Sequence, residues 1–306
     1  MLAGAALLPA QAEATSGELA LNPRGLGLSE AAAAELERAI AAEDWRLAES
    51  SLFAAVRGNP ASAGLRRALG IAHYQAGRHF LAAAELKRAD AIETLDEGTR
   101  HLLASAYLRI GRRHWARAEL GRLIERQPES PSYRYSLARI LYEQQRFGAA
   151  TSELRSALRA DPEFAEAHDL LGQCLEGLGR TEEAATAYRR AIDLFKTGHA
   201  PSPWPLYHLG SLLHDLGQME GARAALEQAV KVDAGHVPSL RELGGVLLKS
   251  GRLDDSAKAL ETAARLEPDS EVIQYSLMRV YRLMGRTDLA ANALRRYQEI
   301  SNRVGQ

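Results

Sequence analysis

The sequence predicts an all-helical protein, an α-solenoid of about eight helix-turn-helix repeats, and three observations support this prediction. Small residues follow a leucine at a constant interval, a glycine recurs near the middle of most units, and a proline stands near the end of several. The interval is about 34 residues, a period that is typical of stacked helical hairpins, because each hairpin can bury its apolar face only against its neighbours.

The small residues form two series that keep step along the chain. The first series is Gly70, Ala104, Ala138 and Gly172, followed after one slightly longer step by Gly210 and Gly244. The second series lies twelve residues later and comprises Ala82, Ala116, Ala150, Ala184, Ala222, Ser256 and Ala290. Leucines at spacings of three and four residues accompany both series, as in a helix that buries one stripe. We therefore expect two helices in each unit, which approach closely at the small residues.

The positions of glycine and proline within the units agree with paired helices of roughly a dozen residues. Glycine followed by arginine recurs between the expected helices, at Gly77, Gly111, Gly179, Gly251 and Gly285. Glycine can end a helix in the left-handed conformation without a steric penalty. Proline cannot continue a helix, and it stands near the ends of units at Pro60, Pro128, Pro162 and Pro268.

This pattern resembles the tetratricopeptide repeat family, whose units follow W-x2-L-G-x2-Y…A-x3-F…P with the same period. The resemblance covers most of the chain and implies a right-handed superhelix. The units are 29–62, 63–96, 97–130, 131–164, 165–198, 203–236, 237–270 and 271–304. Unit 29–62 departs from the pattern because it lacks the Leu-Gly pair, so it is either a capping repeat or a divergent helical pair.

The predicted domain organisation has four parts: a truncated signal peptide with linker at 1–28, repeats one to five at 29–198, a Pro-rich insert at 199–202, and repeats six to eight at 203–304. The insert predicts a stiff, non-helical bridge. The apolar stretch Leu2–Ala10 precedes small-x-small cleavage sites, although no basic leader precedes it. The protein is expected to be exported, periplasmic or extracellular, if these residues are a truncated signal peptide, and cytoplasmic otherwise.

Composition argues against several classes of function. The chain has 38 Lys and Arg residues and 39 Asp and Glu residues, which gives a formal net charge of −1. The protein as a whole therefore has no excess positive charge that would attract nucleic acid. No apolar run is long enough for an integral membrane span. The single cysteine, Cys174, excludes an intramolecular disulfide and a multi-cysteine metal site.

No catalytic residue, metal site or cofactor is predicted, and the chain is interpreted as a non-enzyme. His168 and Cys174 are six residues apart on one expected helix, so they lie about 120° apart around its axis and share no face. Cys174 is expected to pack as a small hydrophobe. His208 and His214 have the same spacing, which disfavours a metal pair.

The resemblance implies that the first helix of each unit lines a concave groove for ligands, through unit positions 2, 5, 9, 12 and 13. The predicted partner-binding residues are Arg67, Tyr74, His101, Arg109, Tyr135, Arg139, Tyr142, Tyr207, His214, Arg241, Lys249, Tyr275, Arg279 and Arg282. Unit five is acidic at these positions and its neighbours are basic. A ligand with acidic ends and a basic or neutral middle would complement this pattern.

The leading hypothesis is a scaffold or adaptor that binds a peptide or partner protein in this groove through Tyr and Arg anchors. The alternatives are a self-associating structural protein of the cell envelope and an accessory subunit that presents substrates to a separate enzyme. Nucleic-acid binding through the basic end units is the weakest hypothesis. A clamp for a chaperone's terminal carboxylate is disfavoured, because no asparagine falls on an expected first helix.

Overall fold

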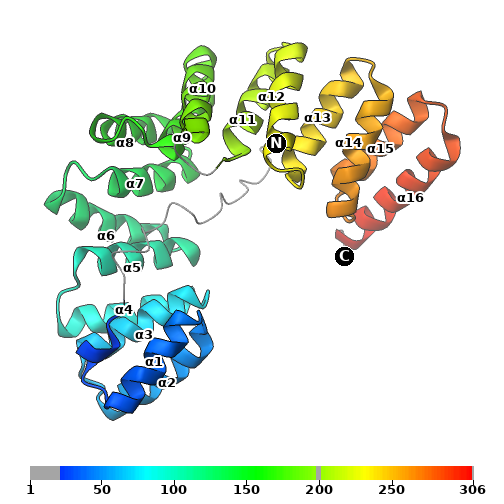
Figure 1. The fold of residues 1–306 in the computed structure, drawn as a ribbon. Coiled ribbons are helices and arrows are strands. Elements are labelled where there is room, and N and C mark those ends of the chain that lie inside the picture. The colour runs from blue at the N-terminus through cyan, green and yellow to red at the C-terminus, as the bar shows by residue number, and fades with distance from the viewer. Residues whose placement is uncertain (1–20, 198–200, 305–306) are drawn as a thin grey trace. The chain divides into compact units, whose positions relative to one another are not determined.

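The computed structural model describes residues 21–197 and 201–304, and its helices follow one another in consecutive pairs (Figure 1). A short 3-10 helix, Pro23–Leu26, precedes the pairs. The first helices of the pairs are α1 (Glu30–Ala41), α3 (Ala63–Gln75), α5 (Glu97–Arg109), α7 (Pro131–Glu143), α9 (Ala165–Gly177), α11 (Trp204–Asp215), α13 (Val237–Lys249) and α15 (Glu271–Leu283). The second helices are α2 (Trp45–Gly58), α4 (His79–Ile92), α6 (Arg113–Arg126), α8 (Phe147–Ala160), α10 (Thr181–Thr197), α12 (Met219–Val232), α14 (Leu253–Leu266) and α16 (Thr287–Val304).

The chain divides into two compact units, a first unit up to Gln144 and a second unit from Gln145 onward. Within each unit, a first helix packs on its paired second helix, which packs in turn on the next first helix. This arrangement confirms the predicted all-α solenoid of helical repeats, while its right-handed sense stays a prediction. The proposed boundary at 199–202 also stays a prediction, because residues 198–200 lie outside the described part, as does the proposed signal peptide up to residue 20.

The turn between paired helices repeats one backbone geometry. The five glycines predicted for it all have φ between 71° and 74°, and Gly217 adopts the same conformation. The Arg78 N–H donates to the His73 carbonyl at 2.8 Å, across the end of α3. This hydrogen bond joins residues five positions apart in the sequence, which is typical of a helix that ends in a left-handed residue. The same turn position holds Glu43 and Gln145, whose positive φ values sequence reasoning did not predict.

The small residues lie where paired helices cross, as predicted. A Cβ atom at Gly210 would lie 2.6 Å from Leu226 Cγ, and one at Gly244 would lie 2.5 Å from Leu260 Cγ. Real Cβ atoms do not approach carbon this closely, so a side chain at Gly210 or Gly244 would force the facing leucine to shift. The period of the sequence therefore marks real helix–helix contacts.

In the first unit, buried ion pairs fill the space between a first helix and the two second helices beside it. Arg100 of α5 contacts Glu119 of α6 at 2.7 Å and Asp90 of α4 at 2.8 Å, and these side chains are 6–11% exposed. One repeat earlier, Arg66 pairs with Glu85 at 2.8 Å. Buried charges are tolerated only when they are paired and hydrogen-bonded in this way.

In the second unit, apolar side chains fill the corresponding space between helices. The positions that correspond to the Arg–Glu pair hold Leu206 with Ala225 and Leu240 with Ala259, all of them buried. Two chemically different solutions thus satisfy the same packing geometry. Within the described residues, every helix is too short or too polar to cross a lipid bilayer.

Candidate functional site

All fourteen predicted partner-binding residues lie on first helices, namely α3, α5, α7, α11, α13 and α15. In each repeat they are separated by three, four or seven residues, or by eight, so they project from one side of the helix. Neighbouring first helices also contact one another, α3 with α5 and, in the second unit, α9, α11, α13 and α15 in turn. We call this side of each unit the first-helix surface.

In the first unit, the predicted residues differ in exposure. His101 is 7% exposed, and its Nε2 lies 3.1 Å from Ser136 Oγ. Tyr135 is 4% exposed. These two side chains therefore contribute mainly to packing within the unit. Arg67 is exposed and forms a 2.7 Å ion pair with Asp96. Tyr74, Arg109, Arg139 and Tyr142 are half-buried, so each offers part of its side chain to the surface.

The second unit contains an aromatic–histidine cluster, which we define as Tyr188, Trp204, Tyr207, His208 and His236. The Trp204 and His236 rings meet edge to face with centroids 4.5 Å apart, and the Tyr188 and His208 rings stack at 5.6 Å. Tyr207 lies 5.4 Å from His208 and 5.8 Å from His236. Burial raises the pKa of Tyr207. The cluster joins α10, α11 and the start of α13.

Two histidine–carboxylate contacts link successive first helices. His208 Nδ1 lies 2.9 Å from Asp169 Oδ1, which joins α11 to α9. His214 Nδ1 lies 2.6 Å from Glu242 Oε1, which joins α11 to α13. The acidic stretch predicted in unit five is thus partly engaged internally, because Asp169 is only 3% exposed.

The most open part of the first-helix surface is the α15 face, which we define as Val272, Tyr275, Arg279, Arg282 and Leu283. These residues occupy all five predicted groove positions of the last repeat, and all five are exposed. Val272 is 55%, Tyr275 45% and Leu283 63% exposed. The Arg279 guanidinium carbon lies 6.0 Å from the centroid of the Tyr275 ring, at the outer limit of a cation–π contact.

A family model described as tetratricopeptide repeat matches residues 101–162, 141–199, 207–271 and 241–303, which together make up more than half of the chain. The matched segments include helices of both compact units. The chain belongs to the tetratricopeptide repeat family. No curated protein sequence matches it.

Solved structures share the fold of this tetratricopeptide repeat protein. One, from Parabacteroides merdae ATCC 43184, has a TM-score of 0.66 and 18% identity, and the match covers 82% of this chain and 98% of that one. PilW, a widely conserved type IV pilus biogenesis factor, has a TM-score of 0.60 and 20% identity over 66% and 92% of the two chains. Pseudomonas aeruginosa PilF has a TM-score of 0.59 and 19% identity over 68% and 97%.

Tetratricopeptide repeat proteins are generally non-catalytic scaffolds for protein or peptide partners. The described part of the chain contains no group of three or more His, Cys, Asp or Glu side chains placed to hold a metal ion. Cys174 is fully buried, and burial raises its pKa to about 12. Its thiol is therefore protonated at neutral pH and packs as a small hydrophobe, as predicted.

Sequence reasoning did not predict the histidines of the aromatic–histidine cluster. The sequence suggests for His208 only a disfavoured metal pair with His214, and His236 precedes α13, outside the five predicted groove positions. Tyr188 stands in the series of core residues that otherwise holds leucine. One feature of the sequence could have indicated the cluster: Tyr188, Trp204 and two histidines occur in adjacent repeats, at positions where other repeats hold different residues.

His236 gives the protein an expected pH dependence. The side chain is 7% exposed, and burial lowers its pKa from 6.5. The unfolded chain therefore binds a proton more readily than the folded chain, so stability is lost as pH falls from about 6.5 through the folded-state pKa. His236→Gln should show a smaller loss of thermal stability between pH 7 and pH 5, by about 1.4 kcal/mol for each unit of pKa depression.

Thermal unfolding followed by far-UV circular dichroism at both pH values measures this effect. His114→Gln, at an exposed histidine of α6, is the matched control and should keep the wild-type difference. An unchanged acid sensitivity in His236→Gln would show that other groups set the pH dependence.

Proposed function

We propose that this protein is an interaction scaffold that binds an extended peptide or a helix of a partner protein on its first-helix surface. The α15 face is its principal anchor, and the basic side chains of α13 extend the contact. The observation that carries this proposal is the exposure of all five groove positions on α15. Family membership supports a protein or peptide as the partner.

The chemistry of the α15 face suits a binding surface. Tyr and Arg dominate interface hot spots, because they bury a large area at a small cost in side-chain entropy. Val272 and Leu283 add apolar area beside the guanidinium groups of Arg279 and Arg282. An exposed apolar patch with a polar rim typically marks an interaction site rather than ordinary surface.

The charges of the neighbouring helix favour an acidic partner segment. Arg241 and Lys249 lie on α13, which contacts α15. Burial raises the pKa of Tyr207 and the positive charge of Arg241 partly opposes this rise, so the basic region adjoins the aromatic–histidine cluster. A partner with carboxylates beside apolar side chains would therefore complement this part of the surface. The internal engagement of Asp169 weakens the case for a basic segment in the middle of the ligand.

Replacing Tyr275, Arg279 and Arg282 together by alanine should reduce partner retention at least tenfold without unfolding the chain. The three side chains are exposed, so their removal leaves the core intact. The measurement is affinity capture from the source organism with the wild-type and variant proteins as baits, followed by quantitative mass spectrometry. Far-UV circular dichroism of both baits checks that the fold is retained.

Phe80→Ser is the matched control, because Phe80 is 68% exposed but lies on the second helix α4. This variant should retain the same partners as the wild type. Equal retention by the α15 variant would contradict the proposal. A corresponding replacement of Tyr135 is less informative, since that side chain is buried and its loss would disturb packing.

The competing hypotheses make different predictions. Self-association predicts a dimer or larger species in light scattering of the pure protein. An accessory role for a separate enzyme predicts that a catalytic subunit is among the captured partners. Export depends on residues outside the described part of the chain, so we keep it as a proposal.

A further inference from the structure

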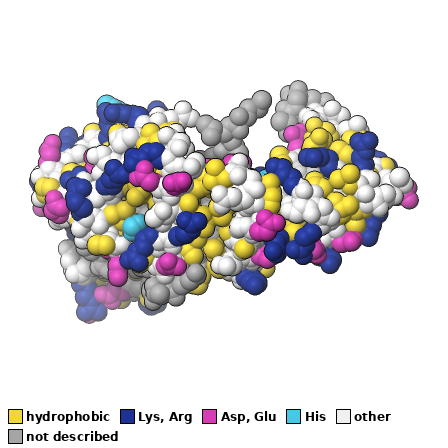
Figure 2. Space-filling view, turned by 90° about the horizontal axis from the view of Figure 1, so that it is seen from above, with side chains coloured by type: hydrophobic (Ala, Val, Ile, Leu, Met, Phe, Trp, Pro, Cys, Tyr) yellow, Lys and Arg dark blue, Asp and Glu magenta, His cyan; other side chains and the backbone are white. Residues whose placement is uncertain are grey.

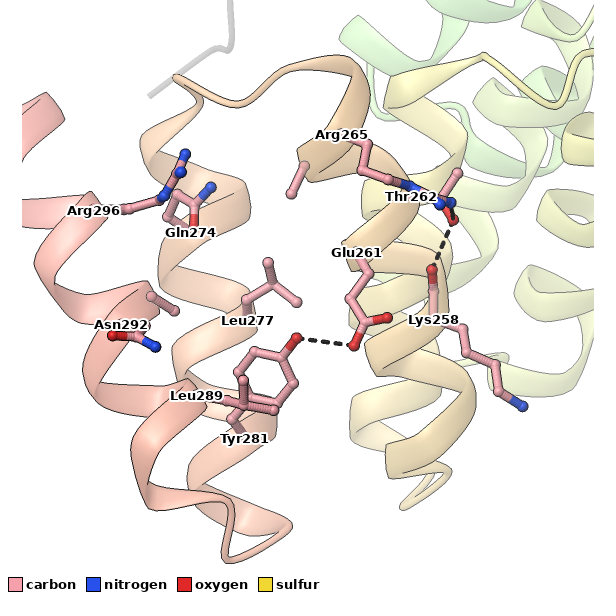
Figure 3. Close-up of a pocket in the computed structure, with 12 residues that line it drawn as sticks. Lys258, Glu261, Thr262, Arg265, Gln274, Leu277, Tyr281, Leu289, Asn292 and Arg296 are labelled. Carbon is pink, nitrogen blue, oxygen red and sulfur yellow. Dashed lines mark hydrogen bonds between the residues drawn. The ribbon is translucent and has the colours of Figure 1, made fainter.

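A pocket of about 490 Å³ lies between α14, α15 and α16 (Figure 3). Gln274, Leu277 and Tyr281 of α15 line it, together with side chains of the two second helices. Leu277 is two residues from both Tyr275 and Arg279, which places it about 200° from them around the helix. The pocket therefore faces away from the α15 face and is a separate surface.

The position of the pocket in the last repeats corresponds to the position of the buried ion pairs in the first unit. In that unit, Arg100, Asp90 and Glu119 fill the interval between one first helix and two second helices. The corresponding positions at the pocket hold Gln274, Ala264 and Ala293. These side chains are shorter, and none carries a charge. Their small size leaves space that elsewhere is occupied by an arginine and two carboxylates.

One end of the pocket is cationic. Arg265 comes from α14 and Arg296 from α16, on opposite walls, with Gln274 between them (Figure 3). Arg265 Nη2 donates to Thr262 Oγ1 at 3.0 Å. Within the described residues, neither guanidinium forms an ion pair with a carboxylate of this chain. Their positive charges are therefore available to a ligand.

The other end of the pocket accepts hydrogen bonds, and its middle is apolar. The Tyr281 hydroxyl donates to Glu261 Oε1 at 2.9 Å (Figure 3). Burial and the neighbouring Glu261 raise the pKa of Tyr281 to about 12, so the phenol keeps its proton and holds this carboxylate in place. Leu277 forms the apolar floor, and Leu289 is 40% exposed at the edge.

We propose that this pocket binds an acidic peptide segment of a partner protein. An apolar side chain of the peptide covers Leu277, and an adjacent carboxylate contacts Arg265 and Arg296. The volume is within the range of sites that enclose small ligands or side chains. Hydrogen bonds between guanidinium and carboxylate are strong because both groups are charged. This site is independent of the α15 face, so the same scaffold has two separate binding surfaces.

Fluorescence anisotropy with the full chain tests this proposal. The probe is a labelled six-residue peptide with blocked ends, in which a central Leu-Phe pair is flanked by two glutamates on each side. A second peptide has glutamines in place of the glutamates. We expect the wild type to bind the acidic peptide at least tenfold more tightly than the glutamine peptide, with binding weakened by added salt.

Two variants examine the pocket, and one examines the α15 face. Arg265→Gln with Arg296→Gln removes the exposed charges and should weaken binding at least tenfold. Gln274→Arg with Ala293→Glu recreates the ion pair of the first unit, fills the pocket and should have a similar effect. Phe80→Ser, which lies outside both surfaces, should bind the probe as the wild type does. The Tyr275, Arg279 and Arg282 variant measures how much of the binding belongs to the α15 face, and the loss in the pocket variants should exceed it. Circular dichroism checks folding, and the exposed-charge variant remains informative if the filled pocket is unstable.

The proposal is overturned if the wild type does not bind the acidic peptide at millimolar concentration, or if both pocket variants bind it as the wild type does. It is also overturned if glutarate alone binds as tightly as the peptide, because the site would then take a free carboxylate. Loss of binding only in the α15 variant would assign the peptide to the first-helix surface and contradict a second site.

Discussion

Arg100→Leu is expected to destabilise the first unit by about 3–5 kcal/mol, because it leaves buried carboxylates without their principal partner. Glu119 is 5% exposed and accepts a hydrogen bond from Arg100 at 2.7 Å. Burial by itself would raise the pKa of Asp90, but hydrogen bonds from Lys87 and the Leu95 N–H and the charge of Arg100 together lower it. Arg100 bridges both carboxylates, and the substitution removes this bridge.

The matched control is the double variant Arg100→Leu with Glu119→Ala, which copies the Leu–Ala combination of the sixth and seventh repeats. It should recover most of the lost stability, since replacing a buried ion pair by apolar side chains is often close to neutral. Asp90 keeps its hydrogen bonds from Lys87 at 3.0 Å and from the Leu95 N–H at 3.3 Å.

Urea unfolding followed by circular dichroism measures both variants. Hydrogen exchange of the α5 and α6 amides reports on the unit locally, because repeat arrays can unfold in parts. A double variant no more stable than Arg100→Leu would contradict this account of the network.

Gly244→Leu is expected to destabilise the second unit by about 1–3 kcal/mol or more, because the added side chain overpacks the crossing of α13 with α14. The new Cβ atom alone would lie 2.5 Å from Leu260 Cγ. Leu260 is fully buried, so it cannot swing into solvent to make room. The helices must separate, and the contacts of the whole repeat weaken. Thermal and urea unfolding of the purified variant measure the loss.

The adjacent residue provides the control. A Cβ atom at Gly245 would meet no other group within 4 Å, and the equivalent position holds Ile71 and Arg279 in other repeats. Gly245→Leu should therefore leave stability unchanged or raise it by up to about 1 kcal/mol, because leucine favours a helix more than glycine does. Similar losses for the two variants would show that the crossing is not specific to Gly244.

The distribution of charge is consistent with recognition by local sites rather than by a global field. Figure 2 shows basic and acidic side chains interspersed on the visible face of the molecule. The formal net charge of −1 agrees with this mixture. Partner binding is therefore expected to depend on particular groups, such as the arginines of the α15 face and of the pocket, and at those sites to be sensitive to salt.

The periodicity of the sequence was sufficient to predict the paired helices and the side of each that carries the candidate surface. Gly210 and Leu226 belong to the same repeat, and their contact follows from the local geometry of a single hairpin. Gly77 and its equivalents end their helices for an equally local reason, since only a left-handed residue closes the turn. Such contacts recur in several repeats, so a single chain displays them more than once.

Exposure and pairing on that surface depended on contacts between different repeats. His208 meets Asp169 across 39 residues and His214 meets Glu242 across 28, and neither pair recurs with the period. The burial of His101 and Tyr135 and the pocket beside Gln274 likewise depend on which side chain the neighbouring repeat supplies. The sequence by itself determined the helical repeat, because its packing rule is local and repeated. Only the tertiary structure decided which groove positions are open, because that depends on single, non-repeated contacts between successive hairpins.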